Sequence, residues 1–326
     1  MAISVVFLGS PAFAVPSLRA LASDARFTIP LVVTQPDRPA GRGRQPRPPA
    51  VKEAALELGL PVFQPETLRD PDAVEQLATV APDVMVVVAY GEILRQVVLD
   101  LAPHGCLNVH PSLLPRYRGS SPVQAAILNG DAETGVSIIK LIRHMDAGPI
   151  VAQRRIPLDG TETAGTLSER LANLAAEMLP DVVAGWVAGK LNAVPQDDEA
   201  ATYTRELTTA GARIDWRQDA AAIERLVRAM QPWPKAWSFL EGRRLAILAC
   251  DISQAVSTEP PGTINLTAQP PRVSTGSTDL LLLRVQPEGK REMSAEDWAR
   301  GVRLPRGARF APVEEVGEGS GPQAGA

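Results

Sequence analysis

The sequence predicts an α/β fold, with an open, mostly parallel Rossmann-like sheet covered by helices on both faces, followed by a small OB-like β-barrel domain. Short apolar runs alternate with helical patterns over the first 190 or so residues, as in chains that build parallel sheets. The run V-M-V-V-V-A at 84–89 has no polar alternation, which is typical of a central strand buried on both sides. Beyond residue 210, short β-like runs separated by turn residues favour the barrel.

The individual elements of the first domain are predicted from these runs and from helical periodicity. Strands are expected at 3–8, 29–34, 84–89, 107–110, 136–141 and 150–156. Helices are expected at 16–22, 50–58, 72–80 and 122–129, and a long amphipathic helix at 167–187 closes the domain.

The domain boundaries follow from changes in composition. Residues 1–189 form the first domain, the polar and aperiodic stretch 190–210 is expected to be a linker, and 211–311 form the second domain. In the second domain we expect a helix at 220–230 and strands at 244–250, 262–266, 272–274 and 279–286. Residues 312–326 are poor in apolar residues and rich in Gly and Glu, so they are predicted to be a disordered tail.

The composition is that of a soluble globular protein, with 45% hydrophobic and 21% charged residues in 326. The two cysteines lack metal-ligand spacing and are interpreted as reduced thiols of a cytoplasmic protein. No apolar run reaches the ~20 residues that a membrane span needs, and the chain opens on a strand pattern without a signal peptide. Residues 206–311 carry 15 basic and 12 acidic residues, which is weak evidence for a polyanionic partner.

Several common enzyme classes are disfavoured by their missing motifs. The first predicted strand-to-helix turn, F-L-G-S-P-A-F-A, has one glycine where a dinucleotide-binding turn has G-x-G-x-x-G. Pro11 in that turn also lacks the backbone N–H that a pyrophosphate would need. Walker, G-x-S-x-G and H-E-x-x-H motifs do not occur either, and nothing calls for a metal. The enzyme classes that remain are those that rely on acid–base catalysis and on positioning of the substrates.

The candidate site begins at the end of the predicted strand 107–110. Asn108 and His110 are two residues apart and therefore project from the same face of that strand, and the carboxyl ends of such strands are where ligands bind. His110 taken alone could equally be a core histidine bonded to backbone groups, and Asp146 alone could be turn chemistry. Together, an amide donor, an imidazole and a carboxylate at the strand ends of one sheet would suit acyl transfer.

The same segments carry a resemblance to a known family. The stretch S-L-L-P-R-Y-R-G preceded by Asn-x-His, with Asp146 in M-D-A-G 36 residues after the histidine (146 − 110), resembles the folate-dependent formyltransferases. Within that family the chain is most similar to the branch that formylates methionyl initiator tRNA. F-L-G-S-P-A-F-A, T-Q-P-D-R-P-A-G-R-G-R, V-V-V-A-Y-G-E-I-L and Q-P-W-P-K-A-W carry this likeness, which extends to about residue 311.

The resemblance implies a mechanism and its partners. The donor would be 10-formyltetrahydrofolate, and the acceptor the amine of methionyl initiator tRNA. Asn108 and a protonated His110 would stabilise the tetrahedral oxyanion, and Asp146 would favour the imidazolium and help to move the proton. The folate contacts would come from Val88 and Tyr90 and from the segment Ser112, Leu113, Leu114 and Pro115. A monomer is expected, because no coiled coil or large apolar stripe calls for a dimer.

The acceptor is expected to be recognised by a second set of residues. The segment 34–49 contains Arg38, Arg42, Arg44 and Arg47 against one acid, and its prolines and two glycines predict a loop without helix or strand. By resemblance, this loop would enter the acceptor end of the tRNA, and the basic second domain would hold the acceptor arm through phosphates.

Three alternatives within the family and one outside it remain open on the sequence. A sugar-nucleotide N-formyltransferase would share the trio of Asn108, His110 and Asp146 and the donor. A glycinamide ribonucleotide formyltransferase would lack the second domain, and a formyltetrahydrofolate hydrolase would carry an N-terminal regulatory domain. A non-catalytic RNA-binding protein would explain the barrel and leave the trio unexplained.

Overall fold

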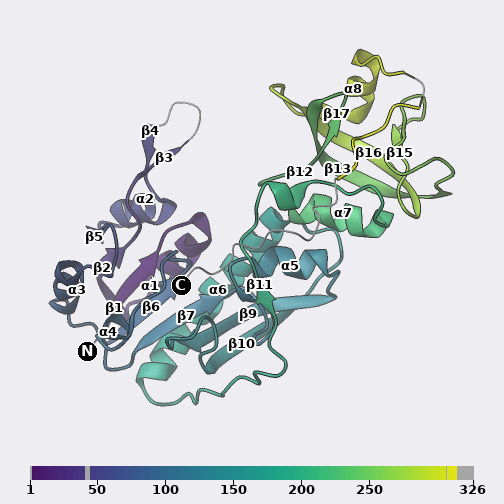
Figure 1. The fold of residues 1–326 in the computed structure, drawn as a ribbon. Coiled ribbons are helices and arrows are strands. Elements are labelled where there is room, and N and C mark those ends of the chain that lie inside the picture. Colours follow the sequence, from purple (N-terminus) through teal and green to yellow (C-terminus); the bar gives the residue numbers. More distant parts are fainter. Residues whose placement is uncertain (1, 41–44, 306, 314–326) are drawn as a thin grey trace, which may run out of the picture. The chain divides into compact units, whose positions relative to one another are not determined.

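The computed structural model describes residues 2–40, 45–305 and 307–313 (Figure 1). The chain divides into two compact units, Met1–Glu206 and Leu207–Ala326, which are described separately below. The predicted tail 312–326 lies outside the described residues from 314 onward.

The first unit is built on a seven-stranded sheet. In spatial order its strands are β10 (Ile150–Pro157), β9 (Glu133–Lys140), β7 (Cys106–His110), β6 (Val84–Val88), β1 (Ile3–Gly9), β2 (Phe27–Val33) and β5 (Val62–Phe63). The five strands from β7 to β5 are parallel, whereas β9 runs antiparallel to β7 and β10 antiparallel to β9. The predicted open, mostly parallel sheet is therefore confirmed.

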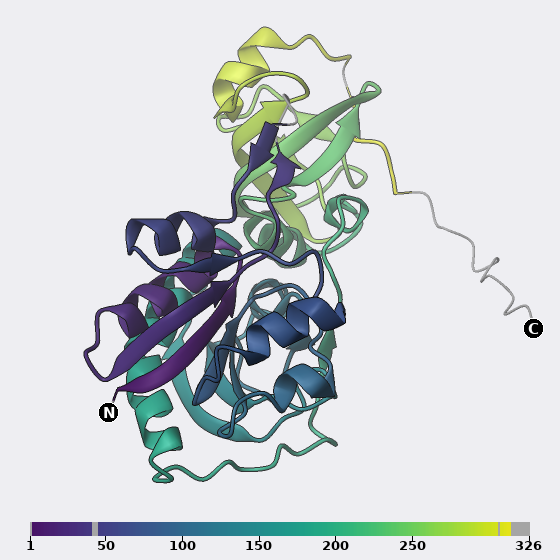
Figure 2. The same cartoon turned by 90° about the vertical axis from the view of Figure 1, so that its left-hand side faces the viewer.

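Helices cover both faces of this sheet (Figures 1 and 2). On one face, α3 (Pro71–Ala78) and α4 (Gln96–Leu99) pack on alternate strand residues such as Val6, Met85 and Val87. The residues in between, such as Val86 and Val88, project to the opposite face, because strand side chains alternate. That face is covered by α1 (Val15–Ala22) and α6 (Ala164–Val187), which pack against each other, while α2 (Ala50–Glu57) lies against α1 and α5 (Pro122–Leu128) against α6. Every residue of β6 is buried, as its apolar run predicts.

The first turn after β1 depends on Gly9. A Cβ at this position would lie 2.9 Å from the carbonyl oxygen of Val88 and 2.9 Å from the Cβ of Ala14, closer than real Cβ contacts. The short 3-10 helix η1 (Ala12–Ala14) follows directly and leads into α1. The single glycine of this turn therefore serves close packing between strand and helix.

The arginine-rich segment 34–49 contains a β-hairpin, contrary to the predicted irregular loop. Strands β3 (Arg38–Ala40) and β4 (Gln45–Arg47) pair antiparallel, with Arg38 opposite Arg47 and Pro39 opposite Pro46. Proline lacks a ladder donor and is tolerated only at edges, and an isolated two-stranded hairpin consists of two edge strands. The prediction that the prolines exclude strands from this segment was therefore wrong. Arg42 and Arg44 lie outside the described residues.

The stretch expected to be a linker, 190–210, packs on the first unit as far as Thr204. Val194 exchanges two backbone hydrogen bonds of 2.8 Å with Ile150 at the start of β10. Further on, β11 (Tyr203–Thr204) pairs in parallel with β8 (Arg118–Gly119), just after the predicted site segment. The division between the units falls at 206/207, after this pairing.

The second unit is an antiparallel sheet in the order β12 (Ala236–Leu240), β13 (Arg243–Val256), β16 (Thr278–Pro287), β15 (Arg272–Val273) and β14 (Ile264–Asn265), with β17 (Met293–Ser294) paired to β16. Bridges from Leu240 to Phe310 and from Thr263 to Arg309 join its two edges, which gives the predicted barrel. Helix α7 (Ala220–Ala229) packs on β13 and β16. The 3-10 helix η2 (Ala210–Ala212) precedes it, and α8 (Ala295–Gly301) packs on β16 and β17.

The start of α7 depends on an N-cap. Asp219 Oδ1 accepts a 2.6 Å hydrogen bond from the backbone N–H of Ala222, one of the donors that a helix start leaves unpaired. We expect Asp219→Ala to lower the free energy of unfolding of the second unit by about 1 kcal/mol, the usual cost of a lost N-cap. Urea unfolding measures this, with Asp219→Asn as control because asparagine also caps. Equal destabilisation by both variants would contradict the prediction.

Within 2–40, 45–305 and 307–313, none of the helices has the length and apolar character that crossing a bilayer requires.

Candidate active site

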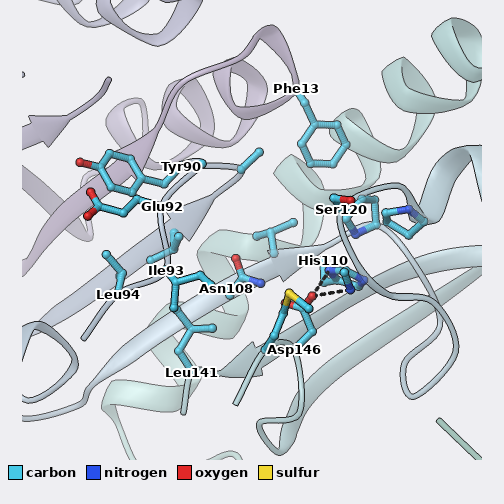
Figure 3. Close-up of a pocket in the computed structure, with 18 of the residues that line it drawn as sticks. Phe13, Tyr90, Glu92, Ile93, Leu94, Asn108, His110, Ser120, Leu141 and Asp146 are labelled. Atoms are coloured by element: carbon cyan, nitrogen blue, oxygen red, sulfur yellow. Dashed lines mark hydrogen bonds and ion pairs between the residues drawn. The ribbon is translucent and has the colours of Figure 1, made fainter. Parts of the chain in front are cut away.

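A pocket lies at the carboxyl end of β7 in the first unit. It has a volume of about 580 Å³, in the range of small-molecule sites. Asn108, His110 and Asp146 line it together with residues of the loop that follows β6. Figure 3 shows these three side chains gathered toward one part of the pocket, with Tyr90, Glu92 and Leu94 toward another.

His110 is held by one of its ring nitrogens. Its side chain is almost entirely buried, and Nε2 lies 2.8 Å from the backbone carbonyl oxygen of Tyr117. A carbonyl oxygen can only accept, so Nε2 carries a hydrogen and donates. The other nitrogen, Nδ1, is 3.7 Å from Oδ2 of Asp146. The histidine is therefore bonded to the backbone in the core, and its Nδ1 remains available on the side of Asp146.

Asp146 reaches His110 by a route that the sequence did not indicate. It lies on the loop between β9 and β10, and β9 runs antiparallel to β7, so that Lys140 at the end of β9 pairs with Leu107 and not with His110. The loop therefore has to turn back along the sheet before its carboxylate faces the imidazole. Asp146 Oδ2 also accepts a 2.8 Å hydrogen bond from the backbone N–H of Gly119. Asp146 thus follows a strand of the same sheet, but one that runs opposite to the strand of Asn108 and His110.

Asn108 differs from His110 in its exposure and in its hydrogen bonding. It is partly exposed in the pocket, and its β7 position pairs with Val87 of β6. Among the residues that the structure describes, no group forms a hydrogen bond with its side-chain amide. The amide is therefore available to donate to a ligand.

Tyr117, which the sequence analysis did not single out, positions His110. Its backbone is in the left-handed region, with φ of 63°, which turns its carbonyl toward the imidazole. Its N–H donates to Thr202 Oγ1 at 2.8 Å, and its hydroxyl donates to Asp131 Oδ2 at 2.8 Å. Burial, and then Asp131, raise the pKa of Tyr117. The Y-R-G part of the family segment was the available signal, but only the folded chain gives it this role.

The residues predicted to contact folate separate into two groups. Tyr90 lines the pocket, whereas Val88 is fully buried and projects to the opposite face of the sheet. Among the described residues, Ser112–Pro115 are not in the pocket lining. Ser112 is fully buried and donates from Oγ to the carbonyl of Arg116 at 2.6 Å.

Ser112–Pro115 are hydrogen-bonded to β9 and β10. The hydroxyl of Ser137 on β9 donates to the Ser112 carbonyl at 2.6 Å and accepts from the Leu114 N–H at 3.1 Å. Gln153 on β10 donates to the Leu114 carbonyl at 3.1 Å and to Ser137 Oγ at 2.8 Å. The segment is thus bound to the two antiparallel strands of the sheet.

The rest of the pocket is largely apolar and was not predicted from the sequence. Glu92 is its acidic exception: Thr67 Oγ1 donates to Oε1 at 2.5 Å, and the Leu68 N–H donates to Oε2 at 3.0 Å. Burial, and then Glu92, raise the pKa of Tyr90, so its phenol stays a hydrogen-bond donor. Many of the apolar side chains come from the loop after β6, α4 and the loop after β9: Ile93, Leu94, Leu99, Leu141, Ile142 and Met145.

In the part of the chain that the structure describes, no group of three or more His, Cys, Asp or Glu side chains is placed to hold a metal ion. Of the predicted tRNA-binding arginines, Arg38 and Arg47 are exposed on the hairpin, away from the residues that line the pocket.

Comparisons with known proteins show which family the chain is similar to. Residues 1–183 match the family model described as "Formyl transferase", and residues 206–303 match "Formyl transferase, C-terminal domain". A protein of Roseiflexus sp. (strain RS-1) named methionyl-tRNA formyltransferase is 52% identical over 311 residues, which cover 95% of this chain and 96% of the relative. One of Neisseria meningitidis serogroup B with the same name is 44% identical over 310 residues, covering 94% and 99%.

Solved structures share the fold at low identity. An N-formyltransferase from Helicobacter canadensis, in complex with folinic acid and dTDP-3-aminofucose, has a TM-score of 0.64 at 15% identity and covers 86% of this chain and 99% of its own. HypX from Aquifex aeolicus, in complex with tetrahydrofolic acid, has a TM-score of 0.61 at 16% identity, covering 91% of this chain and 47% of its own. These likenesses establish the fold, and the family follows from the sequence identities: the chain belongs to the methionyl-tRNA formyltransferases, an enzyme family that transfers formyl groups.

Proposed function

We propose that this protein transfers the formyl group of 10-formyltetrahydrofolate to the amino group of methionyl initiator tRNA. The name shared by relatives at 44–52% identity supports the reaction. The observation that carries the residue assignment is the pairing of an unbonded amide, Asn108, with an imidazole whose Nδ1 faces a carboxylate, all lining one pocket.

The chemistry is an acyl transfer. The amine nitrogen of methionyl-tRNA attacks the formyl carbon, a C–N bond forms, and the carbonyl electron pair moves onto the formyl oxygen. Collapse of this tetrahedral intermediate breaks the bond between carbon and N10 of the folate. The amine loses one proton and N10 gains one, so the products are formyl-methionyl-tRNA and tetrahydrofolate.

The oxyanion would be stabilised by two donors. The Asn108 amide donates from one side. Since Nε2 of His110 is bonded to the Tyr117 carbonyl, Nδ1 is the nitrogen left to face the reacting groups, and it must be protonated to donate. Fixed donors of this kind cost no reorganisation when the charge develops, which is why they contribute strongly to rate.

Asp146 would provide the charge that favours a proton on Nδ1. At 3.7 Å, with a Gly119 N–H fixing the same oxygen, the carboxylate faces Nδ1 without a direct hydrogen bond. A water or the attacking amine that lies beside this pair would hydrogen-bond to both. We assign Asp146 to this proton transfer, from the amine toward N10.

The folate is proposed to lie in the apolar part of the pocket, with Tyr90 as a contact. The folate complex of HypX, a protein of the same fold, is consistent with such a pocket. Contacts from Val88 and from Ser112–Pro115 stay predictions. Those of Val88 and Ser112 would have to come from backbone groups, because these two side chains are fully buried.

The hairpin β3–β4 is proposed to bind tRNA. Arg38 and Arg47 are directly opposite each other across its strands, and like charges in that arrangement repel. A phosphate between them would relieve the repulsion. The basic second unit would add sequence-independent phosphate contacts.

We expect the Arg38→Ala, Arg47→Ala double variant to raise KM for methionyl-tRNA several-fold and to reduce its salt dependence by about two charges, since each phosphate contact releases a counterion. KM for 10-formyltetrahydrofolate should not change. Steady-state assays from low to moderate salt measure both. Arg154→Ala, an exposed arginine on β10 at the opposite sheet edge, is the control. An unchanged tRNA KM in the double variant would contradict the assignment.

A direct test of the function offers the protein 10-formyltetrahydrofolate with either charged initiator tRNA or an amino-sugar nucleotide, and follows formyl transfer to each. Formylation of the tRNA is expected. Transfer to the sugar nucleotide alone would overturn the proposal in favour of the sugar-nucleotide enzyme, and release of formate without an acceptor would indicate a hydrolase.

A further inference from the structure

The segment between α6 and the second unit contacts the Asp146 loop through the side chain of Gln196. The Gln196 Nε2 amide donates to the backbone carbonyl of Asp146 at 2.7 Å and to that of Gly148 at 2.6 Å. On its other side, Gln196 Oε1 accepts from Arg118 Nε at 3.1 Å and Nη2 at 2.9 Å. From this network we infer that Gln196 is a positioning residue, which together with Arg118 holds the backbone around Asp146 in the conformation that aims its carboxylate at His110. The inference rests on the proposed role of Asp146.

The orientation of the Gln196 amide follows from its partners. A guanidinium has only donors, so it must face the amide oxygen, and two carbonyl oxygens have only acceptors, so they must face the NH2 group. The flipped amide would lose all four hydrogen bonds. Gln196 therefore links the guanidinium of Arg118 to the backbone around Asp146.

Asp146 needs such a link because its backbone is strained. Its φ of 51° lies in the left-handed region, which non-glycine residues adopt only when the surroundings enforce it. On the following turn, Gly148 packs so closely that a Cβ there would lie 1.8 Å from the Lys140 carbonyl oxygen. Gln196 bonds the carbonyls of both residues, so it holds the loop across the strained position.

The side chain of Arg118, to which Gln196 bonds, is itself held in place by burial and by further hydrogen bonds. It is 2% exposed, and its guanidinium also donates to Asp198 Oδ1 at 2.6 Å and to the Tyr203 hydroxyl at 3.1 Å. It belongs to β8, which pairs with β11, and its neighbour Gly119 donates to the Asp146 carboxylate. The backbone and the side chain of Asp146 are thus both held by hydrogen bonds that lead to the two-residue strand β8.

The same chain segment also reaches His110. Thr202 Oγ1 accepts from the N–H of Tyr117, whose carbonyl holds the imidazole. Residues 194–204 therefore set the separation between His110 and Asp146 from both sides, and a stretch without periodicity or catalytic side chains becomes part of the active-site framework.

The test is Gln196→Glu, which keeps the acceptor for Arg118 and removes both donors to the Asp146 loop. We expect kcat to fall about tenfold to a hundredfold, the effect of a misplaced catalytic group. KM for both substrates should stay within about twofold, because binding groups are untouched. The matched control is Asn192→Asp, the same amide-to-carboxylate change at an exposed position of the same segment, which should keep full activity. Wild-type kcat in Gln196→Glu would overturn the inference.

A double variant separates positioning from general destabilisation. If Gln196 acts through Asp146, then Gln196→Glu should cost less than about twofold in kcat in an Asp146→Asn background, because coupled residues are not additive. A full additive loss would overturn the inference. Should Gln196→Glu fail to fold, as judged by its thermal midpoint, Gln196→Met takes its place with the same expectations. Normal kcat in Asp146→Asn alone would instead refute the proposed role of Asp146. A lowered kcat in Asp146→Asn together with a normal kcat in Gln196→Glu would refute only the role of Gln196.

Discussion

His110→Ala is expected to lower kcat by at least about 10²–10³, the cost of removing one oxyanion donor. The loss of kcat should exceed this range, because the substitution removes the oxyanion donor and also the imidazole that Asp146 faces in the proposed proton transfer. The affinity for methionyl-tRNA should be nearly intact, since the imidazole is buried at the carboxyl end of β7 and the proposed tRNA contacts are on the exposed hairpin. Single-turnover formylation together with tRNA binding measures the two effects separately.

The control for this variant is His104→Ala. His104 contributes its backbone carbonyl to a 2.9 Å hydrogen bond from Trp186, which a side-chain substitution leaves in place. It is not among the described residues that line the pocket. Near-normal kcat in His110→Ala would remove His110 from the mechanism, and equal losses in both histidine variants would point to folding rather than chemistry.

Asn108→Asp is expected to lower kcat by about 10²–10³ as well, for a different reason. The side chain keeps its size, but a carboxylate has acceptors only, so the donor to the oxyanion is replaced by a negative charge next to it. The fold should tolerate the change, because the Asn108 side chain is partly exposed and bonds to no other described group.

The measurement compares Asn108→Asp with Asn108→Ala. Both lose the donor, and only the aspartate adds repulsion, so the aspartate variant should be the slower one. Thermal midpoints of the two should stay close to that of the unmodified protein. If Asn108→Ala retained full kcat, the amide would not be the oxyanion donor and its position beside His110 would be structural.

Secondary structure and family were predictable from the sequence because their signals are local or follow one contiguous motif. The all-apolar run of β6 predicted a central strand, and Asn-x-His at a strand end predicted two side chains in one pocket. The hairpin in segment 34–49 was missed because proline content indicates lost donors but not whether the strand that carries them is an edge strand.

The details of the site depend on contacts between residues far apart in the chain. Composition and motif determined the α/β fold and the enzyme family, and they predicted the trio of Asn108, His110 and Asp146. The tertiary structure decided which nitrogen of His110 is bonded, because that depends on the carbonyl of Tyr117. It also decided the path of the Asp146 loop, because β9 runs antiparallel to β7. Periodicity and motifs describe single elements, whereas Gln196 and Asp146, 50 positions apart in the chain, come into contact only when the sheet forms.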